Sequence, residues 1–206
     1  EVWEYNLSIA REAVLAGFDE IQFDYVRFPS EGDLSSAVFP HDDGRRKEDV
    51  IADFLAEARR QVGALGAWVS ADIFGLVPSA QDDLGIGQYY EKVAAAVDYV
   101  SPMAYPSHYA PGTYGILDPN SRPYETVRAT MGDALWRAPA GGAIIRPWLQ
   151  DFSLGRHYGP AEVRAQIAAV RDAGLEEWLL WNPGGVYSEG AFSGGRREWG
   201  LRARVR

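Results

Sequence analysis

The chain has 206 residues, 47% of them hydrophobic and 24% charged, and this ordinary globular composition predicts one domain with a sizeable core. A formal net charge of -9 argues against nucleic acid or an anionic membrane as partner, because no basic surface is available to neutralise phosphates; a neutral ligand is favoured. The absence of cysteine excludes disulfides, thiolate metal sites and a cysteine nucleophile, and no apolar run approaches the roughly 20 residues that membrane insertion needs.

Helices and strands are predicted to alternate along the chain. The predicted helices cover residues 3–16, 47–64, 89–97, 124–137 and 160–173, and the predicted strands cover residues 20–26, 67–75, 98–106, 143–149 and 177–183. The helices are indicated by apolar residues at helical spacing, and the strands by short runs rich in β-branched and aromatic residues. The glycine-rich run 184–195 has no clear helix after it and is interpreted as a loop.

The first helix shows the helical pattern clearly. Leu7, Ala10, Val14 and Leu15 are predicted to share one face, and Gly17 stands where a C-terminal cap belongs. We therefore expect this face to pack on the core and the chain to turn at the glycine.

The first strand shows a two-residue alternation. Ile21 and Phe23 lie on one side, and Gln22 and Asp24 lie on the other. A charge at the end of an apolar strand is costly unless it is paired or used. The fold should therefore open a pocket at the strand ends.

The alternation of helix and strand predicts an α/β fold with a parallel sheet and helical crossovers. Loops that follow strands are long, whereas loops that precede strands are short and contain glycine, which is typical of a TIM-type (β/α) barrel. The alternative is an open doubly wound sheet. Because five strand units fall short of a complete (β/α)8 barrel, we expect residues 1–206 to form a single barrel domain that corresponds to strands 4 to 8 and lacks the first strands.

Two aspartates follow successive strands, so we expect both carboxylates at one rim of the sheet. Glycoside hydrolysis uses such a pair, one as nucleophile or base and one as general acid. We predict Asp24, beside Arg27, as the ionised nucleophile or base and Asp72, enclosed by apolar neighbours, as the acid. The structural alternative is that Asp24 pairs with Arg27 and Asp72 caps a loop. Asp19 enters the first strand at the opposite end of the sheet and is expected to be structural.

Aromatic and polar residues follow the later strands and suit a carbohydrate, because rings can stack on sugars and polar groups can bond hydroxyls. The predicted substrate-binding residues are Arg27, Tyr105, His108, Trp148, Gln150, Asp151, Trp181 and Asn182. Asp151 is also a candidate third carboxylate. The three histidines, His41, His108 and His157, are scattered, and no glycine motif for phosphate or nucleotide binding occurs, so no metal and no cofactor is expected.

Six runs form a specific pattern along nearly the whole chain. They are F-D-Y-V-R-F-P (23–29), S-A-D-I-F-G (70–75), I-G-Q (86–88), S-P-M-A-Y-P-S-H-Y (101–109), R-P-W-L-Q-D-F (146–152) and W-L-L-W-N (178–182). In order and spacing they resemble the bacterial glycoside hydrolase-like domain family with a (β/α)-barrel fold. The resemblance implies a barrel of the glycosidase type but supplies no substrate.

A more distant similarity, through G-F-D-E-I-Q-F-D-Y and M-A-Y, is to chitinase-type barrels. Those enzymes carry an acidic glutamate two residues after the last aspartate of the motif, and Val26 stands there in this chain, so their substrate-assisted chemistry is not expected. Barrels of the α-amylase and α-galactosidase type are similar in having a nucleophilic aspartate after the fourth strand. If residues 20–24 are that strand, Asp72 falls where the amylase-type acid stands.

The predicted function is hydrolysis of glycosidic bonds in a polysaccharide by two carboxylates. The alternatives are a non-catalytic carbohydrate-binding barrel and a metal-dependent deacetylase or hydrolase. An extracellular or cell-envelope location is expected, with a cytoplasmic one left open. The sugar, its linkage, the stereochemical outcome and the oligomeric state stay open.

Overall fold

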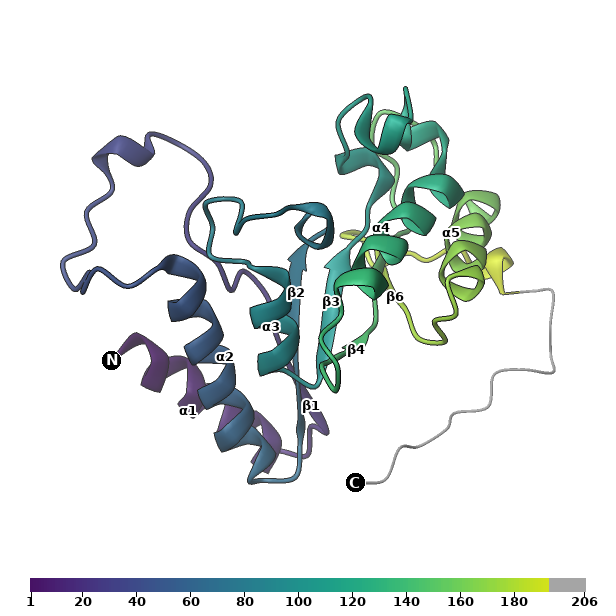
Figure 1. The fold of residues 1–206 in the computed structure, drawn as a ribbon. Helices are drawn as coiled ribbons and strands as arrows, with labels where there is room; N and C mark the ends of the chain where they lie inside the picture. The colour runs from purple at the N-terminus through teal and green to yellow at the C-terminus, as the bar shows by residue number, and fades with distance from the viewer. Residues whose placement is uncertain (193–206) are drawn as a thin grey trace.

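The computed structural model describes residues 1–192, and helices and strands alternate through this range (Figure 1). The helices are α1 (Val2–Leu15), α2 (Lys47–Gly63), α3 (Tyr90–Ala96), α4 (Pro123–Arg137) and α5 (Pro160–Asp172). The strands are β1 (Glu20–Phe23), β2 (Trp68–Phe74), β3 (Tyr99–Met103), β4 (Ile144–Ile145), β5 (Trp148–Gln150) and β6 (Leu179–Trp181). Every predicted helix is confirmed to within one residue at each end. Of the predicted loop 184–195, residues 184–192 form a loop with one short 3-10 turn, and residues 193–195 lie outside the described residues.

All strand pairs are parallel, and the sheet order is β1-β2-β3-β5-β6, with β4 paired to β3. Neighbours in the sheet thus follow chain order, without the reversal that marks a doubly wound sheet. The sheet curls into a half-barrel, and the helices lie along its outer side (Figure 1). The predicted α/β class and TIM-type architecture are confirmed in this form, and the numbering of the strands as 4 to 8 stays a prediction.

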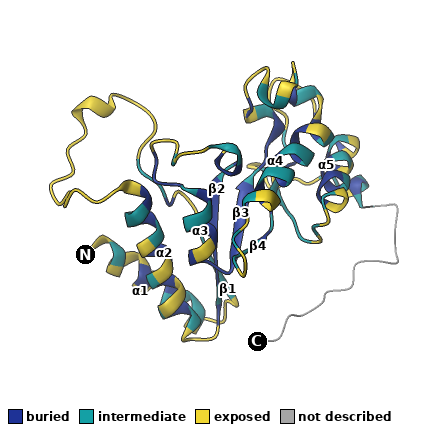
Figure 2. Ribbon diagram, in the orientation of Figure 1, coloured by how far each residue is buried: buried dark blue, intermediate teal, exposed yellow. Residues whose placement is uncertain are grey.

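The hydrophobic core lies between the outer face of the sheet and the helices. Val69, Ala71 and Ile73 of β2 have no exposed surface and alternate with residues of the inner face. The facing stripe of α2 supplies Ile51, Phe54, Leu55, Ala58 and Val62. In Figure 2, β2 and β3 are dark blue along most of their length, whereas the loop between β1 and α2 is yellow. The inner face of the sheet is therefore left free to carry polar groups.

The predicted apolar face of α1 is only partly correct. Leu7 and Ala10 are buried and Val14 packs against the core, but Leu15 is 78% exposed. The helix ends at Leu15, and Gly17 turns the chain with a left-handed φ of 105° and donates its N–H to the carbonyl of Val14. A leucine at this last position extends past the packed surface.

All five predicted strands are longer than the observed ones: 67–75 by one residue at each end, 177–183 by two at each end, and 98–106 by one at its start and three at its end. The other two differ for local backbone reasons. The strand predicted over 20–26 ends at Phe23, because Tyr25 has a φ of 54° that no strand residue adopts. The strand predicted over 143–149 is split into β4 and β5 around Pro147, which has no N–H to donate to a ladder. The carbonyl of Pro147 still accepts the N–H of Leu179, and β5 continues between β3 and β6.

Candidate functional site

A pocket with a volume of about 670 Å³ lies at the C-terminal ends of the strands. It is lined by Gln22, Asp24, Tyr25, Arg27, Glu31, Asp72, Phe74, Gly75, Leu76, Leu84, Gln88, Met103, Tyr105, His108, Tyr109, Trp148 and Trp181. These residues come from β1, β2, β3, β5 and β6 and from the loops that follow them. The C-terminal end of the sheet is the end at which TIM-type barrels carry their sites. The sequence pattern therefore located the pocket correctly.

Asp72 points into this pocket from the inner face of β2 and is only 6% exposed. The indole Nε1–H of Trp148 donates a hydrogen bond of 2.9 Å to its Oδ1. Burial, together with the negative charge of Asp24, raises the pKa of Asp72 from its ordinary 3.8 to about 7, against the opposing effect of the Trp148 hydrogen bond. Asp72 can therefore hold a proton near neutral pH and donate it.

Asp24 lies next to Asp72 because β1 and β2 are paired in register. The last pairs of this ladder are Gln22 with Ser70 and Phe23 with Ala71, so Asp24 follows β1 at the edge of the sheet where Asp72 lies, and its charge acts on Asp72. Asp24 is exposed to solvent at the pocket, and its Oδ1 accepts the main-chain N–H of Tyr25 at 2.7 Å. The two carboxyl groups thus share one pocket in contrasting surroundings, one open and one enclosed. Carboxylate pairs that divide acid and base roles have this arrangement.

The predicted contact between Asp24 and Arg27 is not formed. The Arg27 Nη1 donates to Ser30 Oγ at 3.0 Å and to the carbonyl of Phe28 at 3.2 Å. Its guanidinium carbon lies 4.9 Å from the ring centroid of Phe74. No ion pair joins Asp24 to Arg27 within residues 1–192, so the interpretation of Asp24 as a structural salt-bridge partner is wrong.

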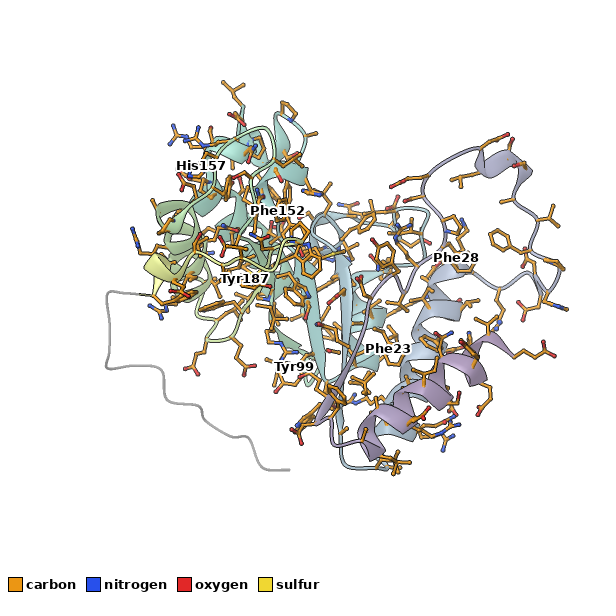
Figure 3. The ribbon with its side chains drawn as sticks, turned by 180° about the vertical axis from the view of Figure 1, so that it is seen from behind. Phe23, Phe28, Tyr99, Phe152, His157 and Tyr187 are labelled. Carbon is orange, nitrogen blue, oxygen red and sulfur yellow. The ribbon has the colours of Figure 1, made fainter. Side chains whose placement is uncertain are left out.

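An ion pair closes the inner face below the pocket. Both terminal nitrogens of Arg146 bind the carboxylate of Glu20, whose Oε1 also accepts the hydroxyl of Ser70 at 2.6 Å. The guanidinium carbon of Arg146 lies 4.2 Å from the ring centroid of Tyr99, which Figure 3 labels toward the lower end of the sheet. The positive charge of Arg146 lowers the pKa of Asp72, and the negative charge of Glu20 raises it. This pair was missed in the sequence, although Glu20 continues the inward alternation of Gln22 and Asp24.

Aromatic residues wall the pocket. The rings of Trp148 and Trp181 meet edge to face with centroids 6.0 Å apart, and Tyr105 meets Phe152 edge to face at 5.5 Å. Phe152, labelled in Figure 3, comes from the loop after β5 and packs against Tyr105 from outside the pocket lining. Partial burial lowers the pKa of His108, and burial raises the pKa of Tyr105. The pocket thus offers neutral hydrogen-bonding groups and flat apolar faces.

Three predicted binding residues lie outside the pocket lining, and their polar groups are bonded within the protein. Gln150 accepts the N–H of Ser107 at 3.0 Å, and it donates to the carbonyl of Phe152. Asp151 is 3% exposed and accepts the N–H and the hydroxyl of Ser188 at 2.8 and 2.7 Å. Asn182 donates to the carbonyl of Asp151 and orders the turn that follows it. These residues follow strands, as predicted, but their hydrogen bonds hold the loops after the strands in place.

Gln88 connects a long loop to the C-terminal end of β2. It is 1% exposed, its Oε1 accepts the N–H of Phe74 at 3.0 Å, and its Nε2 donates to the carbonyl of Asp72 at 3.1 Å. The short run I-G-Q was the signal for this residue in the sequence. Gly75, which follows Phe74, leaves no room for a side chain, since a Cβ there would lie 2.5 Å from the carbonyl oxygen of Met103.

Trp148 is expected to set the pH range of this site. In Trp148→Phe the N–H donor to Asp72 is lost and the ring is largely kept, so the pKa of Asp72 should rise by about one unit, the equivalent of about 1.4 kcal/mol. The measurement is a carbon-13 NMR titration of the Asp72 carboxyl group in the variant and in the wild type. The control is Trp181→Phe, which removes an indole that does not donate to Asp72. An equal pKa of Asp72 in the Trp148→Phe variant and the wild type would contradict the assignment.

Within residues 1–192, no helix is both long and apolar enough to cross a membrane. In the same range, no group of three or more His, Asp or Glu side chains is placed to hold a metal ion.

The half-barrel, with its pocket at the C-terminal ends of the strands, defines an α/β domain built on part of a TIM-type barrel. The chain belongs to the family described as "Putative glycosyl hydrolase domain", whose model matches residues 1–187. The predicted family is thereby confirmed. The comparison with curated proteins gave no match.

Solved structures with a similar fold include a spore cortex-lytic enzyme and chitinases. The spore cortex-lytic enzyme SleL of Bacillus megaterium QM B1551 is 13% identical with a TM-score of 0.61, over 93% of this chain and 52% of that one. A chitinase of Chromobacterium violaceum is 15% identical with a TM-score of 0.54, over 86% and 64%. A mutant of Ostrinia furnacalis Group II chitinase catalytic domain 2, in complex with (NAG)5, is 12% identical with a TM-score of 0.55, over 87% and 64%. The chain spans 52% to 64% of the length of these structures.

Proposed function

We propose that this domain hydrolyses glycosidic bonds of a polysaccharide by a two-carboxylate mechanism. Asp72 is the general acid that protonates the leaving oxygen, and Asp24 is the nucleophile or base on the other side of the anomeric carbon. The observation that supports this most is the state of Asp72, which is buried, bonded to Trp148 and raised in pKa to about 7 beside an open carboxylate. A carboxylic acid that stays protonated at neutral pH is what a glycosidase acid needs.

The roles of the two aspartates follow from their surroundings. Asp24 is open to solvent at the pocket and is oriented by the N–H of Tyr25, so its carboxylate can face a sugar or a water. Asp72 is enclosed, and burial keeps it protonated up to about pH 7, so it can give its proton to a leaving group. Val26 is buried and carries no acid, which argues against the chitinase arrangement in which the acid stands at that position.

The aromatic walls support a carbohydrate ligand. Trp148, Trp181 and Tyr105 line the pocket together with the carboxyl groups. Indole and phenol rings offer flat apolar faces with a polar edge, which suits the mixed surface of a sugar. The (NAG)5 ligand of the Ostrinia furnacalis chitinase makes N-acetylglucosamine oligomers a reasonable first substrate to test.

The test is turnover of a panel of polysaccharides, with N-acetylglucosamine polymers, β-glucans and α-glucans assayed by release of reducing ends. Wild type should release product from at least one of them, and the double variant Asp24→Asn/Asp72→Asn should release none. Equal rates in the wild type and the double variant would reject the mechanism. Binding of a sugar by both proteins without any product would favour the second candidate, a non-catalytic carbohydrate-binding barrel, which the aromatic walls support equally well.

A further inference from the structure

Tyr25 combines two features that folding alone does not explain. It has a left-handed φ of 54°, a conformation that is unfavourable for a residue with a side chain and that glycine or asparagine adopts more easily. Its side chain is 77% exposed, so the ring gains little from burial. Strained residues of this kind gather at ligand sites. The ring also lines the pocket, immediately after Asp24.

The ring of Tyr25 is held from one side. The guanidinium carbon of Arg27 lies 5.5 Å from the Tyr25 ring centroid and 4.9 Å from that of Phe74. Arg27 is itself fixed through Ser30 and the carbonyl of Phe28. A cation over one face of a ring restrains the ring and leaves the remaining surface open to a ligand. This gives Arg27 a supporting position behind Tyr25.

The backbone of Tyr25 ties the ring to the reacting carboxylate. Its N–H donates to Asp24 Oδ1 at 2.7 Å, so the same left-handed turn that presents the ring also orients the Asp24 carboxylate. A sugar stacked on the ring would thus lie one residue away from the carboxylate. The left-handed turn at Tyr25 thus has two roles, since it presents the ring and orients the Asp24 carboxylate. These roles explain why a tyrosine stands at a position where asparagine would fold more easily.

We propose that Tyr25 is a sugar-stacking platform beside the reacting bond, and that it takes a pyranose unit through the apolar face that the ring C–H groups of the sugar form. The proposal rests on the proposed function, because Asp24 acts there as nucleophile or base. It deepens that function by naming the residue that selects the sugar unit next to the cleaved bond.

Binding tests this platform independently of catalysis. On the Asp72→Asn background, the affinities for (NAG)5 and for cellopentaose are measured by titration calorimetry in Tyr25→Phe and Tyr25→Asn. Tyr25→Phe keeps the ring and should bind within about twofold of the parent, whereas Tyr25→Asn keeps the turn and the N–H but should lose about tenfold in affinity. Trp136→Ala, which removes an aromatic side chain that is 85% exposed on α4 outside the pocket lining, should change neither affinity.

The outcomes separate the platform from the hydrolase. Unchanged affinity in Tyr25→Asn, or no binding of either pentasaccharide by the parent, would overturn the platform. Ring-dependent binding together with no hydrolysis by the wild type would keep the platform and reject the proposed function. If Tyr25→Asn unfolds at lower urea than the parent, Tyr25→Gly, which relieves the left-handed φ completely, replaces it in the same measurement.

Discussion

Replacing Asp72 by Asn should lower hydrolysis by about 10²- to 10⁴-fold, the usual contribution of a positioned general acid. Asparagine has the same size and still accepts the N–H of Trp148, so the pocket should keep its shape. Only the transferable proton is lost. In wild type the rate should fall about tenfold per pH unit above a limb near pH 7, since the pKa of Asp72 is about 7 and the acid must be protonated.

The same substitution should stabilise the protein at alkaline pH. The pKa of Asp72 in the folded state, about 7, lies above its ordinary 3.8, so its stabilising contribution is full below pH 3.8 and is lost as the pH rises through 7. Each pKa unit corresponds to about 1.4 kcal/mol, so the loss at pH 8 can reach about 4 kcal/mol. Asp72→Asn removes this cost and should unfold at higher urea than wild type at pH 8, with a smaller difference at pH 5.

Urea unfolding at pH 5 and pH 8 and the pH profile of the rate together check this expectation. The matched control is Asp19→Asn, which changes an exposed aspartate that precedes β1 at the opposite end of the sheet. It should leave the reaction rate, the pH of the alkaline limb of the rate profile and the urea midpoint of unfolding as they are in wild type. A destabilised Asp72→Asn at pH 8, or a rate that is independent of pH between 6 and 8, would show that Asp72 is not the protonated acid.

Arg146→Met should destabilise the folded state by about 2–4 kcal/mol, because it leaves the carboxylate of Glu20 without its cation in a partly enclosed place. The side chains of Arg146 and Glu20 are 14% and 25% exposed, so solvent screens their interaction only in part. The loss should be smaller in Glu20→Gln/Arg146→Met, where no unpaired charge remains. The cation also lowers the pKa of Asp72, so its removal should shift the alkaline limb upward.

A double-mutant cycle in urea at pH 7 measures this coupling. The free energies of unfolding of wild type, Glu20→Gln, Arg146→Met and the double variant are compared. An interaction energy above about 1 kcal/mol is expected for a two-pronged contact of this kind. Strictly additive losses would mean that the pair closes the inner face without stabilising it.

The helices could be predicted closely because their apolar residues repeat locally. The stripe of α2 from Ile51 to Val62 needs no distant partner to be recognised, and the observed helix begins at the predicted residue. The strand predicted over 143–149 was less well predicted, because its pairing depends on β3 and β6, and Pro147 interrupts it. The exchange of partners along β4 and β5 has no pattern within the segment itself.

The candidate site shows the same division. Asp24 and Asp72 could be placed at one rim because parallel strands end at the same edge. The contacts of Arg27, Asp151 and Asn182 could not be foreseen, because each depends on a loop whose path is set by the fold. A side chain that follows a strand either enters the pocket or holds a neighbouring loop in place. The sequence pattern is the same in both cases, so it does not tell them apart.

By itself, the sequence determined the α/β class, the order of helices and strands, and the end of the sheet that carries the pocket. These properties follow from local periodicity and from the parallel direction that helical crossovers impose. Only the tertiary structure decided that Asp72 is enclosed, that Trp148 donates to it, and that Glu20 pairs with Arg146 across the inner face. Burial and hydrogen bonding between distant residues set a pKa, and both arise only when the curled sheet brings those residues together.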